Sequence, residues 1–234
     1  MKLKRLLGTA VCLALQTSIS TYGLCCDRLD LQVTTTPVQP QSGWALKRHY
    51  QIKAQPLTAY STILIGDSLI QQWDTAQLSN VQNLGVSADR TQNVLWRLAD
   101  LNLIQASPEK VLVLAGTNNL GAGDPPCSIA EGLLAIVAKI KAAWSSAQII
   151  VVEIPPRGAD FAFRDEDRKA INALVRQTLA ADQQVAVINL DDALTCGRQN
   201  YCSNYKEDKI HFTAEGYGLF NGLLMRQLNP AAQE

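Results

Sequence analysis

The feature that most constrains this chain is the alternation of short apolar runs with longer amphipathic stretches. The runs are rich in Val, Ile and Leu and mostly lack polar alternation, as is typical of strands buried on both faces. Four of them occupy residues 62–65, 111–115, 149–154 and 185–190, and residues 81–84 form a weaker fifth.

Helical stretches separate these runs. Residues 127–144 keep their apolar side chains on one stripe, and Pro125 and Pro126 mark the expected helix start. Further helices are predicted after the charged run 164–169 and from about Thr213. The alternation predicts an α/β fold, a three-layer doubly wound parallel sheet of about five strands with helices on both faces.

The first residues are typical of a secretory signal peptide. Basic residues precede an apolar run at 6–15, which is followed by small polar residues. That run is too short to span a bilayer, so no transmembrane segment is expected in the mature chain. Cleavage after Ser20 and cleavage after Gly23 both fit. Leu24 and Cys25 stand where small residues precede a lipid-modified cysteine, so a lipid anchor is not expected, and the predicted location is the periplasm or the exterior.

Composition and pattern divide the chain into three parts. Residues 1–23 are assigned to the leader, 24–43 to an extended lead-in rich in Thr, Pro, Gln and Ser, and 44–234 to one domain. A chain of 234 residues with 47% hydrophobic residues is long enough for one core.

The net charge of the chain is zero and it has no basic cluster, which argues against a nucleic-acid partner. Its oligomeric state cannot be predicted from one chain.

Five cysteines would remain after leader removal, in a compartment that permits disulfides. Cys196 and Cys202 are expected to close a small loop, and a second bridge could join Cys127 to either Cys25 or Cys26. No CxxC pair or nearby histidine accompanies them, so disulfides are favoured over a metal site.

Polar and glycine residues follow every predicted strand. In open α/β sheets the ligand crevice lies at the carboxyl ends of the strands, so these residues are the candidates for a site. They are Gly66 to Leu69, Gly85, the stretch GTNN at 116–119, PPRG at 155–158 and DKIH at 208–211. Within them the candidate substrate contacts are Asp67, Leu69, Asn119 and Arg157.

A nucleophilic serine needs a base, and the chain has only two histidines. His49 lies among basic residues that oppose its protonation, whereas His211 follows Asp208 by three positions on a predicted loop. That spacing allows a carboxylate to hold the imidazole Nδ1 and leave Nε2 to take the proton of Ser68. Ser68, His211 and Asp208 are therefore the candidate catalytic residues.

Ester cleavage through a serine also needs hydrogen-bond donors for the oxyanion. The backbone N–H of Ser68 at a helix start, the N–H of Gly85 and the side-chain amide of Asn118 are the candidates. Each residue alone has an ordinary structural explanation: Ser68 as a helix cap, Gly85 as a turn residue and Asn118 as a loop residue. Their combination at successive strand ends favours catalysis.

The motifs together resemble the SGNH or GDSL hydrolases. The matching blocks are GDSL at 66–69, Gly85, Asn118 in GTNN and the DKIH stretch, in the same order. The stretches NLGVSADRTQNVLWRL, VLVLAGTNNLG and EIPPRG are most similar to the branch of the platelet-activating-factor acetylhydrolase catalytic subunits. The resemblance covers about 44–228 and implies a flavodoxin-like fold with Ser68 as nucleophile, His211 as base, Asp208 as its orienter, and Ser68, Gly85 and Asn118 as the oxyanion hole.

The predicted activity is hydrolysis of carboxylic esters through an acyl-enzyme, with no metal or organic cofactor required. The chain has no large insertion to build a lid or acyl tunnel, which favours a short acyl group such as acetyl on a carbohydrate or small molecule. Hydrolysis of longer lipid esters or thioesters is the alternative within the enzyme class. A secreted glycan-binding module with a vestigial site is a further alternative, in which Trp73, Trp96, Phe161 and Phe163 would stack on sugars.

Overall fold

The computed structural model describes residues 26–75, 78, 80–197 and 202–228. The predicted leader and Cys25 lie outside these residues. Within the described residues the helices and strands follow one another in the order α1 Arg28–Thr35, α2 Gly43–Lys53, η1 Leu57–Ala59, β1 Thr62–Gly66, α3 Ser68–Gln71, β2 Val81–Asn83, α4 Thr91–Asp100, η2 Leu103–Gln105, β3 Lys110–Leu114, α5 Thr117–Ala122, α6 Pro126–Ala143, β4 Gln148–Val152, η3 Ala159–Phe161, α7 Asp165–Leu179, β5 Val185–Ile188, α8 Asp191–Leu194 and α9 Ala214–Leu228.

The five strands form one parallel sheet in the order β2-β1-β3-β4-β5. This is the flavodoxin-like order: the chain passes from β1 outward to β2 and then crosses back over β1 to β3. The carboxyl ends of β1 and β3 therefore border the point where the strand order reverses. The predicted fold class is confirmed, and the weaker strand predicted at 81–84 spans Val81–Asn83.

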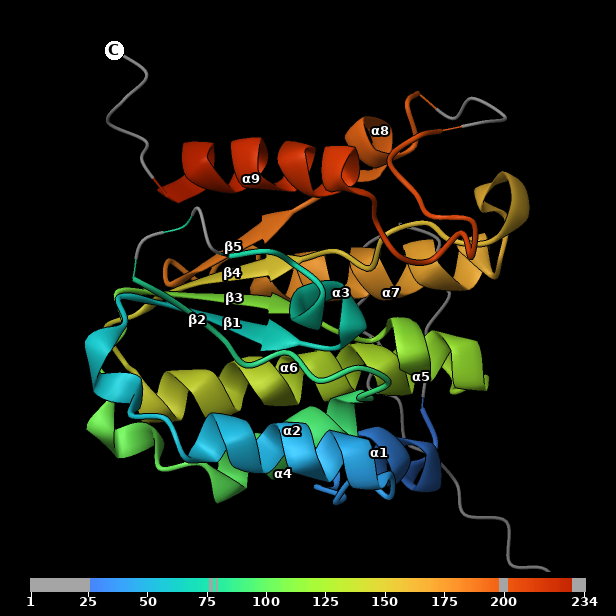
Figure 1. Ribbon diagram of the computed structural model, residues 1–234. Helices are drawn as coiled ribbons and strands as arrows, with labels where there is room; N and C mark the ends of the chain where they lie inside the picture. Colours follow the sequence, from blue (N-terminus) through green and yellow to red (C-terminus); the bar gives the residue numbers. More distant parts are fainter. Residues whose placement is uncertain (1–25, 76–77, 79, 198–201, 229–234) are drawn as a thin grey trace, which may run out of the picture.

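Two apolar layers cover the sheet, because the central strands are buried on both faces. Ile63 and Val113 lie on the face packed by α2, α4, α6 and α7. Leu64 and Leu112 lie on the face packed by α3, α8 and α9. Figure 1 shows α9 and α8 above the sheet and the helices α1, α2, α4 and α6 below it.

The lead-in segment differs from the prediction. Instead of an extended stretch, residues 28–35 form α1, whose first turn is capped by Asp27 through hydrogen bonds from the N–H groups of Leu29 and Asp30. The helix packs against α4 and α6 on the outside of the lower layer (Figure 1). Tertiary packing thus imposes a helix on a segment whose β-branched Val33, Thr34 and Thr35 lower its intrinsic helix propensity.

Both expected disulfides are present in the described residues. Cys26 is joined to Cys127 at the start of α6, which ties α1 to the domain. Cys196 is joined to Cys202, which closes the small loop after α8.

Candidate active site

Ser68 lies at the start of a short helix, directly after the first strand. Asp67 caps α3 by accepting a hydrogen bond from the Leu69 N–H at 2.9 Å. Ser68 is therefore the first residue of α3, where N–H groups have no intrahelical partner. The residue is 7% exposed, so little of it is open to solvent.

Ser68, His211 and Asp208 form a continuous hydrogen-bonded chain. The Ser68 Oγ lies 2.8 Å from His211 Nε2, although the two residues are far apart in sequence. His211 Nδ1 lies 2.7 Å from Asp208 Oδ2. With Nδ1 donating to the carboxylate, Nε2 is the nitrogen left to receive the serine proton. The structure thus brings together the three residues that the sequence singled out.

The Asp208 carboxylate is held in its ionised form. Partial burial opposes ionisation, but hydrogen bonds from the His211 N–H, the His211 ring and the Ile210 N–H outweigh it and lower the pKa of Asp208 to about 2. The backbone bonds form a tight turn at Asp208, so one carboxylate oxygen fixes the loop and the other faces the imidazole.

The loop that carries His211 is fixed at several points. Its two sides pair through the bridge between Tyr205 and Phe212 and the bond from Lys206 N–H to His211 O at 2.8 Å. The neighbouring β4 loop adds the bond from Gly158 N–H to Lys209 O at 2.8 Å. These contacts hold the imidazole before any substrate binds, which is the preorganisation that catalysis needs.

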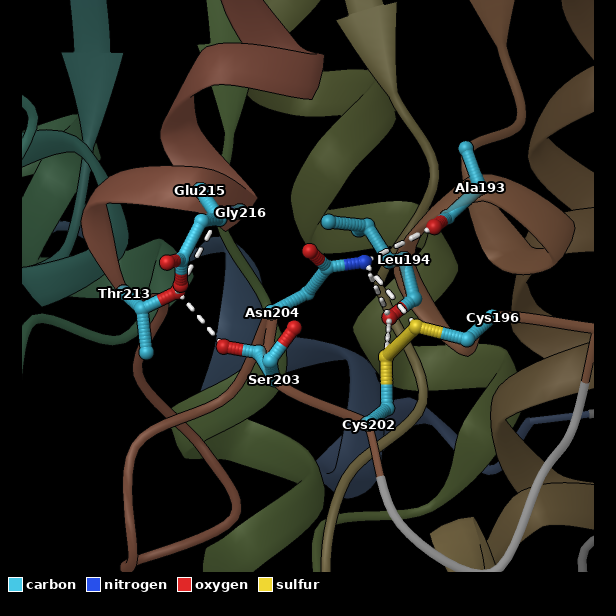
Figure 2. The surroundings of a disulfide bond; sticks show 9 residues. All are labelled: Ala193, Leu194, Cys196, Cys202, Ser203, Asn204, Thr213, Glu215 and Gly216. Atoms are coloured by element: carbon cyan, nitrogen blue, oxygen red, sulfur yellow. Dashed lines mark hydrogen bonds between the residues drawn. A yellow bond between two sulfur atoms is a disulfide. The ribbon is translucent and has the colours of Figure 1, made fainter.

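The Cys196–Cys202 disulfide anchors the base of this loop. Figure 2 shows the Asn204 side-chain amide donating to the carbonyl oxygens of Ala193 and Leu194, at 3.0 and 3.2 Å, beside the disulfide. Asn204 O in turn accepts from the Thr213 N–H at 3.0 Å, two residues after His211. The bridge, Asn204 and Thr213 therefore connect α8 to the start of α9 behind the catalytic loop.

The turn after β2 does not present the Gly85 N–H to the site. That N–H donates to Asn83 Oδ1 at 2.9 Å. A Cβ at Gly85 would lie 2.4 Å from the Gln71 nitrogen, so a glycine is needed here to let the strand end pack against α3. The role of Gly85 seen in the structure is close packing beneath the nucleophile helix, and its expected role as an oxyanion donor does not fit this geometry.

Ala88, three residues further on, is placed differently. Among residues 84–89, all of which the structure describes, its N–H is the one with no hydrogen-bond partner. Ala88 has a left-handed backbone with φ of 60° in a turn closed by the bond from Asp89 N–H to Val86 O. The Asn118 Nδ2 donates to Asp89 O at 2.9 Å, which brings the amide of Asn118 to the same turn.

Asn118 lies in the first turn of α5, after β3, and keeps one amide hydrogen available. An amide NH2 has two hydrogens, and the bond to Asp89 O uses one of them. Asn119 is different, because its amide is fully buried and bonded to Thr91, Gln92 and Asp124. Asn118 is thus the asparagine of this pair that can reach a ligand.

An unpredicted buried ion pair supports the strand ends. Arg97 donates to the Asp89 carboxylate, to Leu84 O at 2.7 Å and to Gly66 O at 3.2 Å. Burial raises the pKa of Asp89 to about 6 although Arg97 opposes this change. Arg97 is only 2% exposed, and the amphipathic pattern of its helix gives no sign that it binds the ends of β1 and β2.

Three of the candidate substrate contacts are enclosed by protein. Asp67 and Asn119 are 0% exposed and Leu69 is 1% exposed, so they stabilise the site from within and do not face a substrate. Burial raises the pKa of Asp67 to about 7, and its Oδ2 is buried without a hydrogen-bond partner.

Arg157, the fourth candidate, is half-buried beside the site. Its Nη1 donates to Thr117 O and Thr117 Oγ1 at 2.9 and 3.1 Å, and its guanidinium lies 4.7 Å from the Phe163 ring centroid. Burial lowers the pKa of Arg157, against the attraction of Asp67 and Asp208. Arg157 remains a candidate substrate contact.

Of the residues assigned to the competing hypotheses, His49, Trp73 and Phe161 are buried, whereas Phe163 is exposed and lies against Arg157. His49 is buried against Trp96 and hydrogen-bonded to Asp100 at 2.8 Å. Trp73 and Phe161 belong to the core at 3% and 7% exposure, which removes them as sugar-stacking surfaces. Among the described residues no group of three or more His, Cys, Asp and Glu is placed to hold a metal ion. No described helix has the length and apolar character needed to cross a membrane.

Known proteins are similar to this chain over most of its length. The chain is 28% identical over 207 residues to platelet-activating factor acetylhydrolase IB subunit alpha1 of Pongo abelii, covering 82% of this chain and 89% of that protein. The human protein of the same name is 28% identical over 192 residues, covering 78% of this chain and 82% of its own.

Solved structures share the fold. A lipase/acylhydrolase from Enterococcus faecalis superposes with a TM-score of 0.59 at 23% identity, covering 74% of this chain and 96% of its own. A carbohydrate esterase family 3 protein from Talaromyces cellulolyticus gives 0.55 at 18% identity, covering 74% and 97%. A model of the GDSL-like Lipase/Acylhydrolase family matches residues 64–219, more than half of the chain. The protein therefore belongs to the GDSL-like lipase/acylhydrolase family and is a hydrolase of ester bonds.

Proposed function

We propose that this protein is an exported serine esterase that removes short acyl groups, such as acetyl, from a carbohydrate or another small ester. The observation that carries the proposal is the hydrogen-bonded chain from Ser68 Oγ through His211 to Asp208 at 2.8 and 2.7 Å. An apolar run typical of a leader and two disulfides support export.

In the proposed mechanism His211 Nε2 takes the proton of Ser68 as its Oγ attacks the ester carbonyl. Asp208 stabilises the imidazolium that forms, and the same proton then passes to the leaving alcohol. Water attacks the acyl-enzyme by the same route, with His211 as base, and releases the acid. No step requires a metal or an organic cofactor.

The oxyanion would be bound by the Ser68 N–H, the Asn118 amide and the Ala88 N–H. Ala88 replaces Gly85 in this assignment because the Gly85 N–H is already bonded to Asn83. The bond from Asn118 to Asp89 O supports the assignment, since it keeps two of the three donors at one turn. Removal of a single donor of this kind typically costs about 10²- to 10³-fold in kcat, which is the loss expected for Asn118→Ala.

The test is hydrolysis of p-nitrophenyl esters of increasing chain length by the mature protein, beside Ser68→Ala and His211→Ala. We expect the wild type to prefer acetate and both variants to lose about 10⁴-fold or more in kcat. Ser145→Ala is the matched control, because Ser145 is exposed in the loop before β4, at the opposite end of the sheet.

Two results would contradict the proposal. Full activity in Ser68→Ala would exclude the acyl-enzyme, and rates that rise beyond butyrate would replace the short-acyl preference with hydrolysis of longer lipid esters or thioesters. Thermal unfolding of each variant checks that a loss of activity is not a loss of folding.

A further inference from the structure

A cavity of about 260 Å³ borders the turn that carries Ala88. One wall is the segment from Val38 to Ala45, and the other is the segment from Ser87 to Asn93. We call this cavity the lead-in pocket. Because the Ala88–Asp89 turn is also bonded to Asn118, the pocket shares a wall with the proposed oxyanion site.

The walls of the lead-in pocket are fixed to each other. The Val38 N–H donates to Gln92 O at 3.0 Å, and Asn93 Nδ2 donates to Val38 O at 2.9 Å. Asn93 Oδ1 also accepts from the Arg90 N–H at 3.0 Å. The hollow is therefore a formed feature of the fold, as small-molecule sites usually are.

The segment that forms the outer wall is itself anchored upstream. Thr34 Oγ1 donates to Ser128 O at 2.6 Å, and Thr91 Oγ1 donates to Thr34 O at 3.0 Å. The Cys26–Cys127 disulfide ties the start of α1 to the start of α6. These contacts hold the lead-in against the domain, which gives that wall a defined position.

The lining is mixed, and its polar members carry no free carboxylate among the described residues. Gln41, Ser42 and Arg90 are polar members of the lining, beside the apolar side chains of Val38, Pro40, Ala45 and Ala88. The one lining acid, Asp89, is 2% exposed and paired with Arg97. Such a mixed set offers donors and acceptors for hydroxyl groups and apolar contacts for the C–H groups of a sugar ring, whereas an acyl chain would leave the polar members unpaired.

From this placement we infer that the lead-in pocket binds the hydroxyl-rich alcohol portion of the ester, a sugar, with Arg90 and Gln41 as specificity-determining residues. The inference rests on the proposed function and adds to it the class of leaving alcohol and the surface that selects it. The acyl carbonyl would lie at Ser68, Asn118 and Ala88, and the sugar would extend past Ala88 into the lead-in pocket.

The experiment measures kcat/KM on an acetylated methyl glycoside and on p-nitrophenyl acetate, for the wild type, Arg90→Ala and Gln41→Ala. The readout is the ratio of the two kcat/KM values, which removes any change common to both substrates. We expect each variant to lower this ratio roughly tenfold, the effect of one lost hydrogen bond to substrate. Gln177→Ala and Arg28→Ala, at exposed positions on α7 and α1, are matched controls that leave the ratio at its wild-type value.

A second measurement does not depend on turnover. Binding of the acetylated glycoside to Ser68→Ala is followed by calorimetry, with and without Arg90→Ala, and the added substitution is expected to weaken binding roughly tenfold. An unchanged ratio and unchanged binding in the Arg90 and Gln41 variants would overturn the inference. The proposed function would survive that result provided that p-nitrophenyl acetate is cleaved and that Ser68→Ala abolishes cleavage.

Discussion

The Asp67 carboxyl, adjacent to the nucleophile, is fully buried and its Oδ2 has no hydrogen-bond partner. Burial is the main cause that raises its pKa from 3.8 to about 7. Between these two values the folded state keeps a proton that the unfolded state has lost. The free energy of unfolding therefore falls as pH rises through this window. The stabilising contribution of the protonated Asp67 carboxyl is fully lost above about pH 7.

Asp67→Asn should remove this pH dependence, because the amide resembles the protonated acid and can still accept the Leu69 N–H. We expect the variant to gain stability relative to the wild type between pH 4.5 and pH 8, by a few kcal/mol, since each tenfold difference in proton affinity corresponds to about 1.4 kcal/mol. Urea unfolding across that range measures it. Asp192→Asn, at an exposed position, is the control, and parallel pH curves for Asp67→Asn and wild type would contradict the prediction.

Gly85 and Ala88 offer a paired test of the turn after β2. Gly85→Ala places a Cβ against the backbone of α3, so we expect a loss of about 1–3 kcal/mol in stability and a fall in kcat as Ser68 shifts. Ala88→Gly relieves a left-handed alanine and keeps the N–H, so stability should change by less than about 1 kcal/mol and kcat should be retained. Urea unfolding and p-nitrophenyl acetate hydrolysis measure both. A stable, fully active Gly85→Ala would contradict the packing role.

At this scale the sequence predicted the side chains of the candidate site better than its backbone donor. Ser68, Asp208 and His211 could be found because their chemistry resides in side chains. The choice of base was also narrow, since the chain has only two histidines. The availability of an N–H depends on what else it bonds, here Asn83 Oδ1 for Gly85, and no residue type reveals that. The contacts of Arg97 with two strand ends are invisible for the same reason.

At the scale of elements, the two disulfides have different structural roles. Cys26–Cys127 closes a sequence separation of 101 residues and Cys196–Cys202 one of 6. A chain-entropy argument assigns the long bridge about 5 kcal/mol and the short one about 2 kcal/mol. Figure 2 shows the short bridge beside Asn204, and Ser203 O, next to Asn204, accepting from Thr213 Oγ1. Thr213 is two residues after His211.

Removal of the two bridges, one at a time, should affect stability and activity to different extents. Cys26→Ala with Cys127→Ala should lower the melting temperature more, whereas Cys196→Ala with Cys202→Ala should lower kcat more, by roughly tenfold or more at a temperature where both variants are folded. Thermal unfolding and p-nitrophenyl acetate kinetics measure the two effects. Equal losses of kcat in the two double variants would contradict a positioning role for the short bridge.

The strands were the elements best predicted from sequence, and the lead-in was the segment predicted least well. A strand buried on both faces must be apolar throughout, so β1, β3 and β4 are visible as runs. The edge strand β5 is half-buried and is also an apolar run. The helix α1 has an exposed face with Leu29 and Val33 and a buried Thr34 bonded to Ser128, which blurs its periodicity. Its formation depends on contacts with α4 and α6, which sequence pattern alone does not supply.

In the whole molecule, the order of the strands explains why motifs that are distant in sequence lie close together. The carboxyl ends of β1 and β3 are adjacent, which places Ser68 and Asn118 at the same edge of the sheet, and the loop before α9 brings His211 to Ser68. Alternating strands and helices predicted this class of fold from sequence. The lead-in pocket could not be predicted, because it forms where the segment after α1 packs against the turn that follows β2 and against the start of α4.

The proposed export concerns the whole chain and gives the last prediction. Cysteine pairs persist as disulfides in oxidising compartments and are rare in the cytosol, so a protein with two of them should depend on the predicted leader for correct folding. Expressed in a bacterial host with residues 1–23 present, the enzyme should appear outside the cytoplasm, cleaved after Ser20 or Gly23 and with both bridges formed. The same chain without those residues should remain in the cytoplasm with reduced cysteines and a lower melting temperature. Intact-mass analysis with and without reductant measures leader removal and bridge formation together, and an uncleaved, reduced protein from the full-length chain would exclude export.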